Sequence, residues 1–274
     1  MSKKLPSDPS GQRSNIRKAL LACLSRIARM EHRLTAYVEK LPAQFVANEY
    51  AYPNVLPLDS VRAVNDIIWG EWQVEKEEDN PPPFWWFGAL IELPYRQGAL
   101  EQLTEINRLA AITETLRGAI PVDSYLLSRH YRDGLAFLQA DAHLSIKSLA
   151  ERTASQVVRE INSGIATGLS REEIADNVIN RLDVSRSNAA RIVDTEVMKA
   201  YNRNRLRAVQ MAREETGLDL RVQHISALLP TTRKHHADRH MHTYTPQQQM
   251  EWWARGANSI NCKCSVRSVL NEEE

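Results

Sequence analysis

The sequence has few cysteines, no long apolar run and almost no net charge, and each of these absences excludes a class of protein. Three cysteines in 274 residues are too few for a disulfide framework, so a reducing compartment fits the chain best. No stretch approaches the roughly 18 uninterrupted apolar residues of a membrane span, so no membrane partner is expected. The 35 lysines and arginines nearly balance 34 acids, which argues against a surface devoted entirely to nucleic acid.

Motifs that mark several common active sites are missing as well. No Gly-x-Gly-x-x-Gly or Walker-type loop occurs, so nucleotide binding has no support. No serine lies in a Gly-x-Ser-x-Gly setting, the signature of many serine hydrolases. We therefore expect a protein that is not an enzyme and has no small-molecule substrate.

Apolar residues recur mainly with the period of a helix, so the predicted fold class is α+β and mostly helical. The pattern predicts helices over residues 15–40, 59–69, 94–117, from 124 or 143 to 166, from 171 onward, and 186–216. The helix from 171 is marked by a capping box between Ser170 and Glu173, and Gly168 ends the helix before it.

The period changes after Gly217, where alternating apolar and polar residues predict a strand that includes Val222. Val266 and Val269 indicate a second short strand. A helical N-terminal region and a small C-terminal α+β module follow from this pattern. The predicted parts are a disordered arm at 1–13, a helical region with a Pro/Trp-rich segment at 14–122, a long-helix region at 123–217, and a His/Cys module at 218–274.

A segment of three prolines precedes four consecutive aromatic residues, which are Phe84, Trp85, Trp86 and Phe87. The prolines stiffen the chain in front of the aromatic group. One interpretation is a core anchor beneath a loop. The other is an exposed patch that binds a partner, because exposed tryptophan clusters mark interfaces.

Histidines and cysteines gather near the end of the sequence, where imidazole and thiolate could bind zinc. His236 and His240 are four residues apart and share a face if the segment is helical. Cys262 and Cys264 are two apart and share a face if that segment is extended. Two ligands from each segment predict a closed, structural zinc site. His235 or His242 could replace His240, and the alternative is a pair of buried thiols beside surface histidines.

The same cluster permits a second interpretation, a metal-dependent nuclease or a delivered effector protein. A histidine-rich segment near Asp238 could activate water on a metal ion. Asp238 stands alone, however, between Asp219 and Glu251. The expected pair of carboxylates is missing, so this interpretation ranks second.

A basic stripe in the helix predicted over 186–216 is the candidate contact for nucleic acid. Lys199, Arg203 and Arg207 align at four-residue spacing and could follow phosphates. The alternative is a solvated face, or a face that pairs with acids such as Asp194 and Glu196.

Four motifs follow one another along the chain. The first is Gly168-Leu169-Ser170-Arg171-Glu172-Glu173-Ile174-Ala175, and the second is Ala190-Arg191-Ile192-Val193-Asp194-Thr195-Glu196 with Tyr201-Asn202. The third is Thr232-Arg233-Lys234-His235-His236-Ala237, and the fourth is Ile260-Asn261-Cys262-Lys263-Cys264. Over about residues 145–270 the chain thereby resembles the phage head morphogenesis, or minor head protein, family, typified by the F protein of phage Mu. The family often has Asp-x-Arg-Thr-Arg where this chain has residues 229–233, and arginine where Lys263 stands. The missing acid and arginine weaken a chemical role for that segment.

The resemblance implies a low-copy internal component of the virion, found in the capsid interior and, during assembly, in the host cytoplasm. It implies the portal protein and the major capsid protein as partners, with packaged DNA as a further candidate. Composition and spacing by themselves indicate none of these partners.

Overall fold

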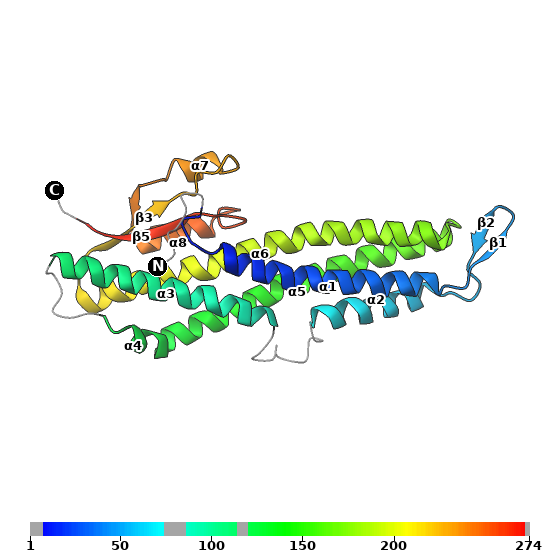
Figure 1. Ribbon diagram of the computed structural model, residues 1–274, viewed down its shortest axis with the longest axis horizontal. Coiled ribbons are helices and arrows are strands. Elements are labelled where there is room, and N and C mark those ends of the chain that lie inside the picture. Colours follow the sequence, from blue (N-terminus) through cyan, green and yellow to red (C-terminus); the bar gives the residue numbers. More distant parts are fainter. Residues whose placement is uncertain (1–7, 74–85, 114–119, 272–274) are drawn as a thin grey trace. The chain divides into compact units, whose positions relative to one another are not determined.

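The computed structural model describes residues 8–73, 86–113 and 120–271, and helices make up most of them (Figure 1). The elements are, in chain order, α1 (Arg13–Glu39), β1 (Gln44–Val46), β2 (Glu49–Ala51), α2 (Pro57–Trp72), α3 (Trp86–Thr113), α4 (Val122–Leu127), α5 (Arg129–Ala166), α6 (Arg171–Thr216), β3 (Leu220–Ile225), α7 (Lys234–Ala237), β4 (Thr243–Tyr244), α8 (Pro246–Ala254) and β5 (Ser265–Leu270). The predicted class, α+β and mostly helical with a small C-terminal strand module, is confirmed.

The chain divides into two compact units, each assembled from distant stretches of sequence. The first unit contains Met1–Lys18, Trp86–Asp141 and Val193–Glu274, and the second contains Ala19–Trp85 and Ala142–Ile192. The four parts expected from composition describe consecutive stretches and stay a prediction. The candidate site lies in the first unit.

The second unit is a bundle of helical segments with a short hairpin formed by β1 and β2. Its core on α1 follows helical spacing, with buried residues at Cys23, Ile27, Met30, Leu34 and Val38. Gly168 has a φ of +68° in the turn between α5 and α6, a value that glycine adopts without strain. The capping box is present, since the backbone N–H of Glu173 donates to the hydroxyl of Ser170 and the Glu173 carboxylate accepts from the Ser170 N–H.

In the first unit α3 packs against both α6 and the small sheet. Gly98 on α3 faces the backbone of Tyr201 so closely that an added Cβ would overlap the Tyr201 carbonyl oxygen. Farther along α3, the fully buried Gln102 hydrogen-bonds to the hydroxyl of Ser268 on β5. The Ser268 N–H donates to the Glu105 carboxylate over 3.1 Å, so α3 supports β5 through polar as well as apolar contacts.

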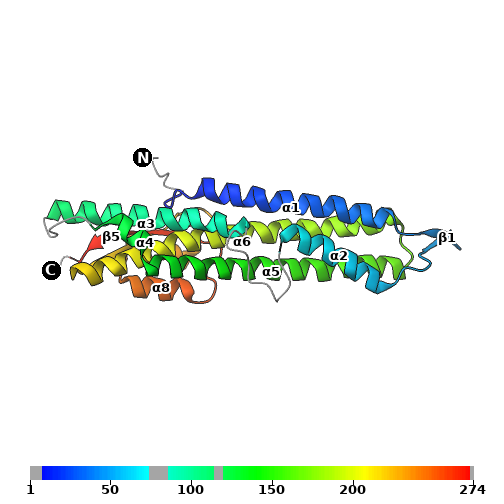
Figure 2. The ribbon, with the colours of Figure 1, turned by 90° about the horizontal axis from the view of Figure 1, so that it is seen from below.

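The small sheet of the first unit has the strand order β4-β3-β5, and both pairings are antiparallel. Along β3 buried and half-buried residues alternate strictly, as expected for a strand with one face on the core. Figure 2 shows α8 and the sheet at the same end of α6. Thr245 caps α8 by accepting from the N–H of Gln248, which fixes where this helix begins.

Two helices differ from the sequence-based prediction. The helices expected from 171 and over 186–216 form one continuous helix, α6, because no glycine or proline interrupts residues 182–186. The helix expected from Pro94 begins eight residues earlier, at Trp86, with Pro94 inside it. Proline is most favourable at a first turn, but it also occurs within helices when packing compensates for the lost hydrogen bond. Among the described residues no helix is long and apolar enough to cross a membrane.

Candidate metal centre

The register of the small sheet places one histidine beside one cysteine. His224 on β3 is in the same phase as the buried Leu220, so its imidazole faces the core and is fully buried. β3 pairs with β5 so that Ile225 lies opposite Ser265. Cys264 directly precedes Ser265, and its thiol therefore lies next to the end of β3 that carries His224.

A short helix delivers the second histidine. His236 lies on α7 and is 2% exposed. The turn before α7 is closed by two hydrogen bonds, from the N–H of Leu229 to the Thr232 hydroxyl and from the N–H of Thr232 to the Leu229 carbonyl. Arg233 then holds the segment after α8 by donating to three carbonyl oxygens, those of Ala257, Asn258 and Ile260.

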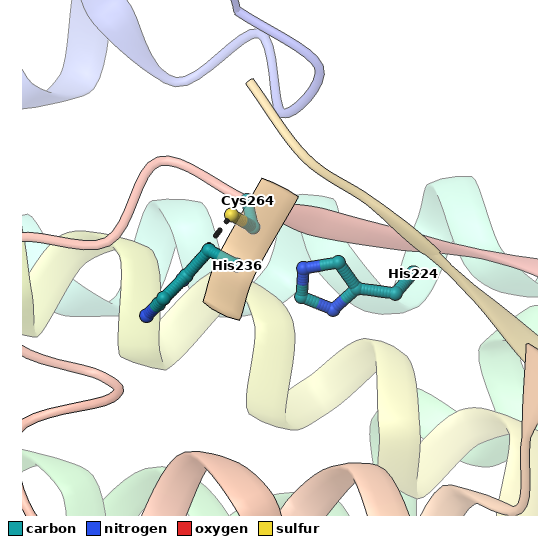
Figure 3. A group of neighbouring side chains, drawn as sticks. All are labelled: His224, His236 and Cys264. Atoms are coloured by element: carbon teal, nitrogen blue, oxygen red, sulfur yellow. Dashed lines mark hydrogen bonds between the residues drawn. The ribbon is translucent and has the colours of Figure 1, made fainter. Parts of the chain in front are cut away.

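The ligand-forming atoms of His224, His236 and Cys264 all lie within 4.8 Å of one another. Figure 3 shows the imidazole of His224 turned toward Cys264, with His236 on the other side of the thiol. Nδ1 of His236 is 3.5 Å from the Sγ atoms of both Cys264 and Cys262. Three of the four predicted ligands, His236, Cys262 and Cys264, thus lie close together. The group of His224, His236 and Cys264 could hold a metal ion.

The fourth predicted ligand, His240, has another role. Its Nδ1 accepts a hydrogen bond from the backbone N–H of Ser226 over 3.1 Å. The alternatives are exposed: His235 has its Nε2 3.1 Å from the Asn258 side-chain oxygen, and His242 directly precedes β4. None of these three histidines belongs to the compact ligand group found among the described residues.

His224 belongs to the ligand group, although the spacing of histidines in the sequence does not indicate it as a ligand. Reasoning from i,i+4 spacing favoured His240, because it assumed a helix through residue 240, whereas α7 ends at Ala237. The signal for His224 was its phase in the strand, two residues beyond the apolar Val222. A polar side chain on the buried face of a strand needs an internal partner.

Side chains from α8 and the preceding loop surround the histidines. Gln249, fully buried on α8, has its side-chain oxygen 3.4 Å from Nδ1 of His224. The same oxygen accepts from the guanidinium of Arg239, which also stacks over the ring of Trp252 at 4.4 Å. The Trp252 ring is 4.7 Å from the ring of His236. The imidazoles are therefore fixed in orientation by hydrogen bonds and aromatic contacts.

The two thiols differ in their affinity for a proton. A hydrogen bond with Cys262 is the largest cause that lowers the pKa of Cys264; burial opposes it, and the nearby imidazoles of His224 and His236 lower this pKa further. The same hydrogen bond and burial raise the pKa of Cys262. The pair therefore favours one thiolate on Cys264, the form that binds metals.

Helix α6 holds the Cys-x-Cys segment through hydrogen bonds and an ion pair. The Thr195 hydroxyl accepts from the backbone N–H of Asn261 over 3.0 Å, and Asn202 donates to the carbonyl oxygen of Cys264 over 2.9 Å. Lys263 forms an ion pair with Asp194. Motif residues that lie about sixty positions apart in the sequence thus make contact, and together they hold the thiols in place.

The cavity beside these side chains has a volume of ≈ 40 Å³ and is lined by residues that include His236, Cys262 and Cys264. This volume suits an ion or a water molecule, whereas pockets for organic ligands measure about 300–1,000 Å³. A second cavity, which also borders Cys262, has a volume of ≈ 320 Å³ and is lined by residues that include Lys199 and Asn202.

Helix α6 from Arg171 onward, α7 and the Cys-x-Cys segment all lie in a stretch of sequence that matches a known family. Residues 155–267 match the model of the family described as phage Mu protein F like protein. This region is therefore similar to the phage Mu F-like family. The matched range includes all four motifs quoted above, and it supports assignment to phage head morphogenesis proteins. No curated protein and no solved structure matches the chain.

Within the Mu F-like region the basic stripe of α6 contacts neighbouring helices, and its role as a nucleic-acid contact stays a prediction. Lys199 forms ion pairs with Asp141 on α5 and with Glu196. The guanidinium of Arg203 lies 5.1 Å from the centre of the Phe137 ring, and burial lowers its pKa. Arg207 donates to the hydroxyl of a buried tyrosine of α3 over 3.4 Å. All three cations are half-buried, so the stripe is part of the packing between helices.

Outside the Mu F-like region, the aromatic segment is only partly described. Phe84 and Trp85 lie outside the described residues. Trp86 begins α3 and is half-buried, while Phe87 is fully buried, with the two rings 5.3 Å apart. Phe87 therefore lies in the core, as the core-anchor interpretation expects, and partner binding by the aromatic segment stays a prediction.

Proposed function

We propose that the chain is a minor head protein of a tailed phage, a low-copy internal component of the virion that acts in head assembly. The match of residues 155–267 to the phage Mu F-like family carries this proposal. The cytosolic type of cysteine usage agrees with assembly in the host cytoplasm, followed by retention in the capsid interior. The portal protein and the major capsid protein are the proposed partners, and packaged DNA is a further one.

The proposed role is structural and not enzymatic. The compact ligand group of the described residues consists of two imidazoles and a thiol, with a second thiol adjoining, and contains no carboxylate. A hydrolytic metal site needs an open coordination position and a general base. Asp238, the nearest acid in the sequence, is exposed at the C-terminal end of α7. No specific contact favours the nuclease alternative.

Zinc is the proposed ion, with a structural role. Thiolates and imidazoles together favour zinc over magnesium or calcium, which prefer oxygen ligands. The strands of the module are short, between two and six residues, so a bound ion would contribute substantially to holding them.

The role in the head is tested by the composition of virions. Particles are purified from a strain carrying the gene and from a strain lacking it, and quantitative mass spectrometry measures the chain relative to portal and major capsid protein. We expect a few copies per particle, retention in DNA-filled heads, and fewer or defective heads without the gene. Absence of the chain from both mature heads and their precursors would sink the proposal.

Partner choice needs a separate measurement. The chain is co-expressed with the portal protein or with the major capsid protein of the same phage, and each pair is tested for co-purification. A stable complex with portal, resistant to nuclease treatment, supports direct association. Loss of the complex on nuclease treatment would point to DNA as the link.

A further inference from the structure

We propose that Nε2 of His224, Nδ1 of His236 and the Sγ atoms of Cys262 and Cys264 form a closed four-ligand zinc site. The assignment gives His224 the position that spacing in the sequence gave to His240. It rests on the structural zinc proposed above and is independent of the role in the phage head.

The distances between donor atoms have the size that a zinc tetrahedron requires. With Zn–S of about 2.3 Å and Zn–N of about 2.0–2.1 Å, a tetrahedral site has S···N edges of roughly 3.5 Å. Nδ1 of His236 lies 3.5 Å from Sγ of Cys262 and 3.5 Å from Sγ of Cys264. Two edges of the tetrahedron are therefore already formed, and they share His236 as their common corner.

His224 offers the nitrogen that completes the set. Its Nδ1 lies 3.4 Å from the side-chain oxygen of Gln249, which leaves Nε2 as the free donor atom. Nε2 is buried and has no hydrogen-bond partner within the described part of the chain. Figure 3 shows a ring nitrogen of His224 directed toward Cys264. A buried imidazole nitrogen without a partner is costly, and coordination of an ion would satisfy it.

The surroundings of His224 are those of a metal ligand. Ligating histidines usually bind an outer-shell oxygen through their second ring nitrogen, which fixes both tautomer and orientation. Gln249 supplies that oxygen, and Arg239 donates to the same oxygen over 3.1 Å. His240, in contrast, uses Nδ1 to accept from the Ser226 backbone, so its present contact serves the loop after β3.

A zinc ion at this position would join three segments of the module. His224 belongs to β3, His236 to α7, and both cysteines to the segment that leads into β5. Four protein ligands leave no position for water or substrate, so the ion would stabilise the module without taking part in catalysis.

The assignment is tested by zinc content and by cobalt spectroscopy on the full chain. Purified wild-type protein is expected to contain one zinc per chain by elemental analysis. After replacement by cobalt, visible bands of tetrahedral Co²⁺ and thiolate-to-cobalt charge transfer should appear. His224→Ala should weaken zinc binding by more than the about 10- to 100-fold expected of an outer-shell change such as Gln249→Ala.

His240→Ala is the matched control for His224→Ala. It also removes one imidazole from the module, but His240 lies outside the ligand group. It should retain one zinc per chain and the cobalt spectrum. The opposite pattern, zinc kept by His224→Ala and lost by His240→Ala, would overturn the assignment. So would a wild-type protein that contains no transition metal and gains no thermal stability from added zinc.

His224→Cys separates ligation from folding. A third thiolate should preserve zinc binding and intensify the charge-transfer band of the cobalt protein. A folded His224→Cys protein with an unchanged cobalt spectrum would contradict the assignment.

The zinc site and the role in the head can fail separately. If a variant that binds no zinc is still incorporated into virions, the head role stands without the zinc site. If the zinc-loaded wild-type chain is absent from virions, the zinc site stands without the head role.

Discussion

Asn202 on α6 donates a hydrogen bond from its side-chain amide to the backbone carbonyl oxygen of Cys264 over 2.9 Å. The bond is buried, and it connects a helix to the Cys-x-Cys segment across 62 positions of sequence. The side chain of Asn202 therefore helps to fix the position of Cys264 and its thiol.

Asn202→Ala should destabilise the protein, because it leaves the Cys264 carbonyl without this donor in a buried environment. Removing one partner of a buried hydrogen bond costs about 1–3 kcal/mol. Urea unfolding of the wild type and the variant measures the difference. Gln210→Ala is the control, since Gln210 is an exposed amide on the same helix and should change stability by less than about 0.5 kcal/mol. Equal effects of the two substitutions would contradict the structural role of Asn202.

Gly98→Ala should be strongly destabilising, because the added Cβ would overlap the carbonyl oxygen of Tyr201 and force α3 away from α6. Overpacking of this kind typically costs about 1–3 kcal/mol, and a backbone atom cannot move aside as a side chain can. The matched control is Gly70→Ala on α2, where an added Cβ meets nothing within 4 Å. Gly70→Ala should stabilise by about 0.5–1 kcal/mol through helix propensity. Thermal unfolding compares the two, and a stable Gly98→Ala protein would refute the close approach.

Asp219 gives the first unit a component of stability that depends on pH. A hydrogen bond with Arg221 is the main cause that lowers the pKa of Asp219, burial opposes it, and Arg221 and Arg213 lower it further through their charge. A lowered pKa in the folded state means that the ionised form stabilises folding. This contribution is present above the unfolded-state pKa and is lost as pH falls through the folded-state value.

Asp219→Asn should therefore lower stability at neutral pH by at most about 1 kcal/mol, because the side chain is 38% exposed and solvent screens the pairs. The difference from wild type should disappear at a pH below the ordinary aspartate value of 3.8. Urea unfolding at several pH values measures it. Asp176→Asn, at an exposed position of α6, serves as the control. A difference that stays constant with pH would argue against this linkage.

The double substitution Arg203→Ala with Arg207→Ala should reduce stability and leave salt-sensitive DNA binding unchanged. Both side chains pack their stems between α6 and α5, so their loss should cost about 1–2 kcal/mol in packing. Fluorescence anisotropy at several salt concentrations measures the number of phosphate contacts. A control pair, Arg255→Ala with Arg267→Ala, removes two exposed cations. If only the Arg203/Arg207 variant lost DNA affinity while remaining folded, the stripe would be a nucleic-acid contact after all.

Helices and strands of this chain were largely predictable from local pattern, whereas their continuity and partners were not. The period of apolar residues and the Ser170–Glu173 capping box located α1 and the start of α6. The continuity of α6 depends on the absence of a breaker near Ser185, a weak signal in comparison with a glycine or proline. The Lys199 stripe looks exposed in sequence because the acid that neutralises it, Asp141, belongs to another helix.

The metal centre shows the same division. The cysteines and His236 could be selected from residue type and spacing alone. His224 required the register between β3 and β5, which depends on pairing across 40 residues of sequence. The i,i+4 spacing of His236 and His240 places both on one face only if a helix continues through residue 240, and α7 ends at Ala237.

The ion pair between Lys263 and Asp194 also has an evolutionary consequence. Two charges that neutralise each other in a half-buried setting constrain each other's replacement, because losing one leaves the other unpaired. Among relatives, positions 194 and 263 should therefore covary: an acid at the first should accompany lysine or arginine at the second, and a neutral residue at one should accompany the loss of charge at the other.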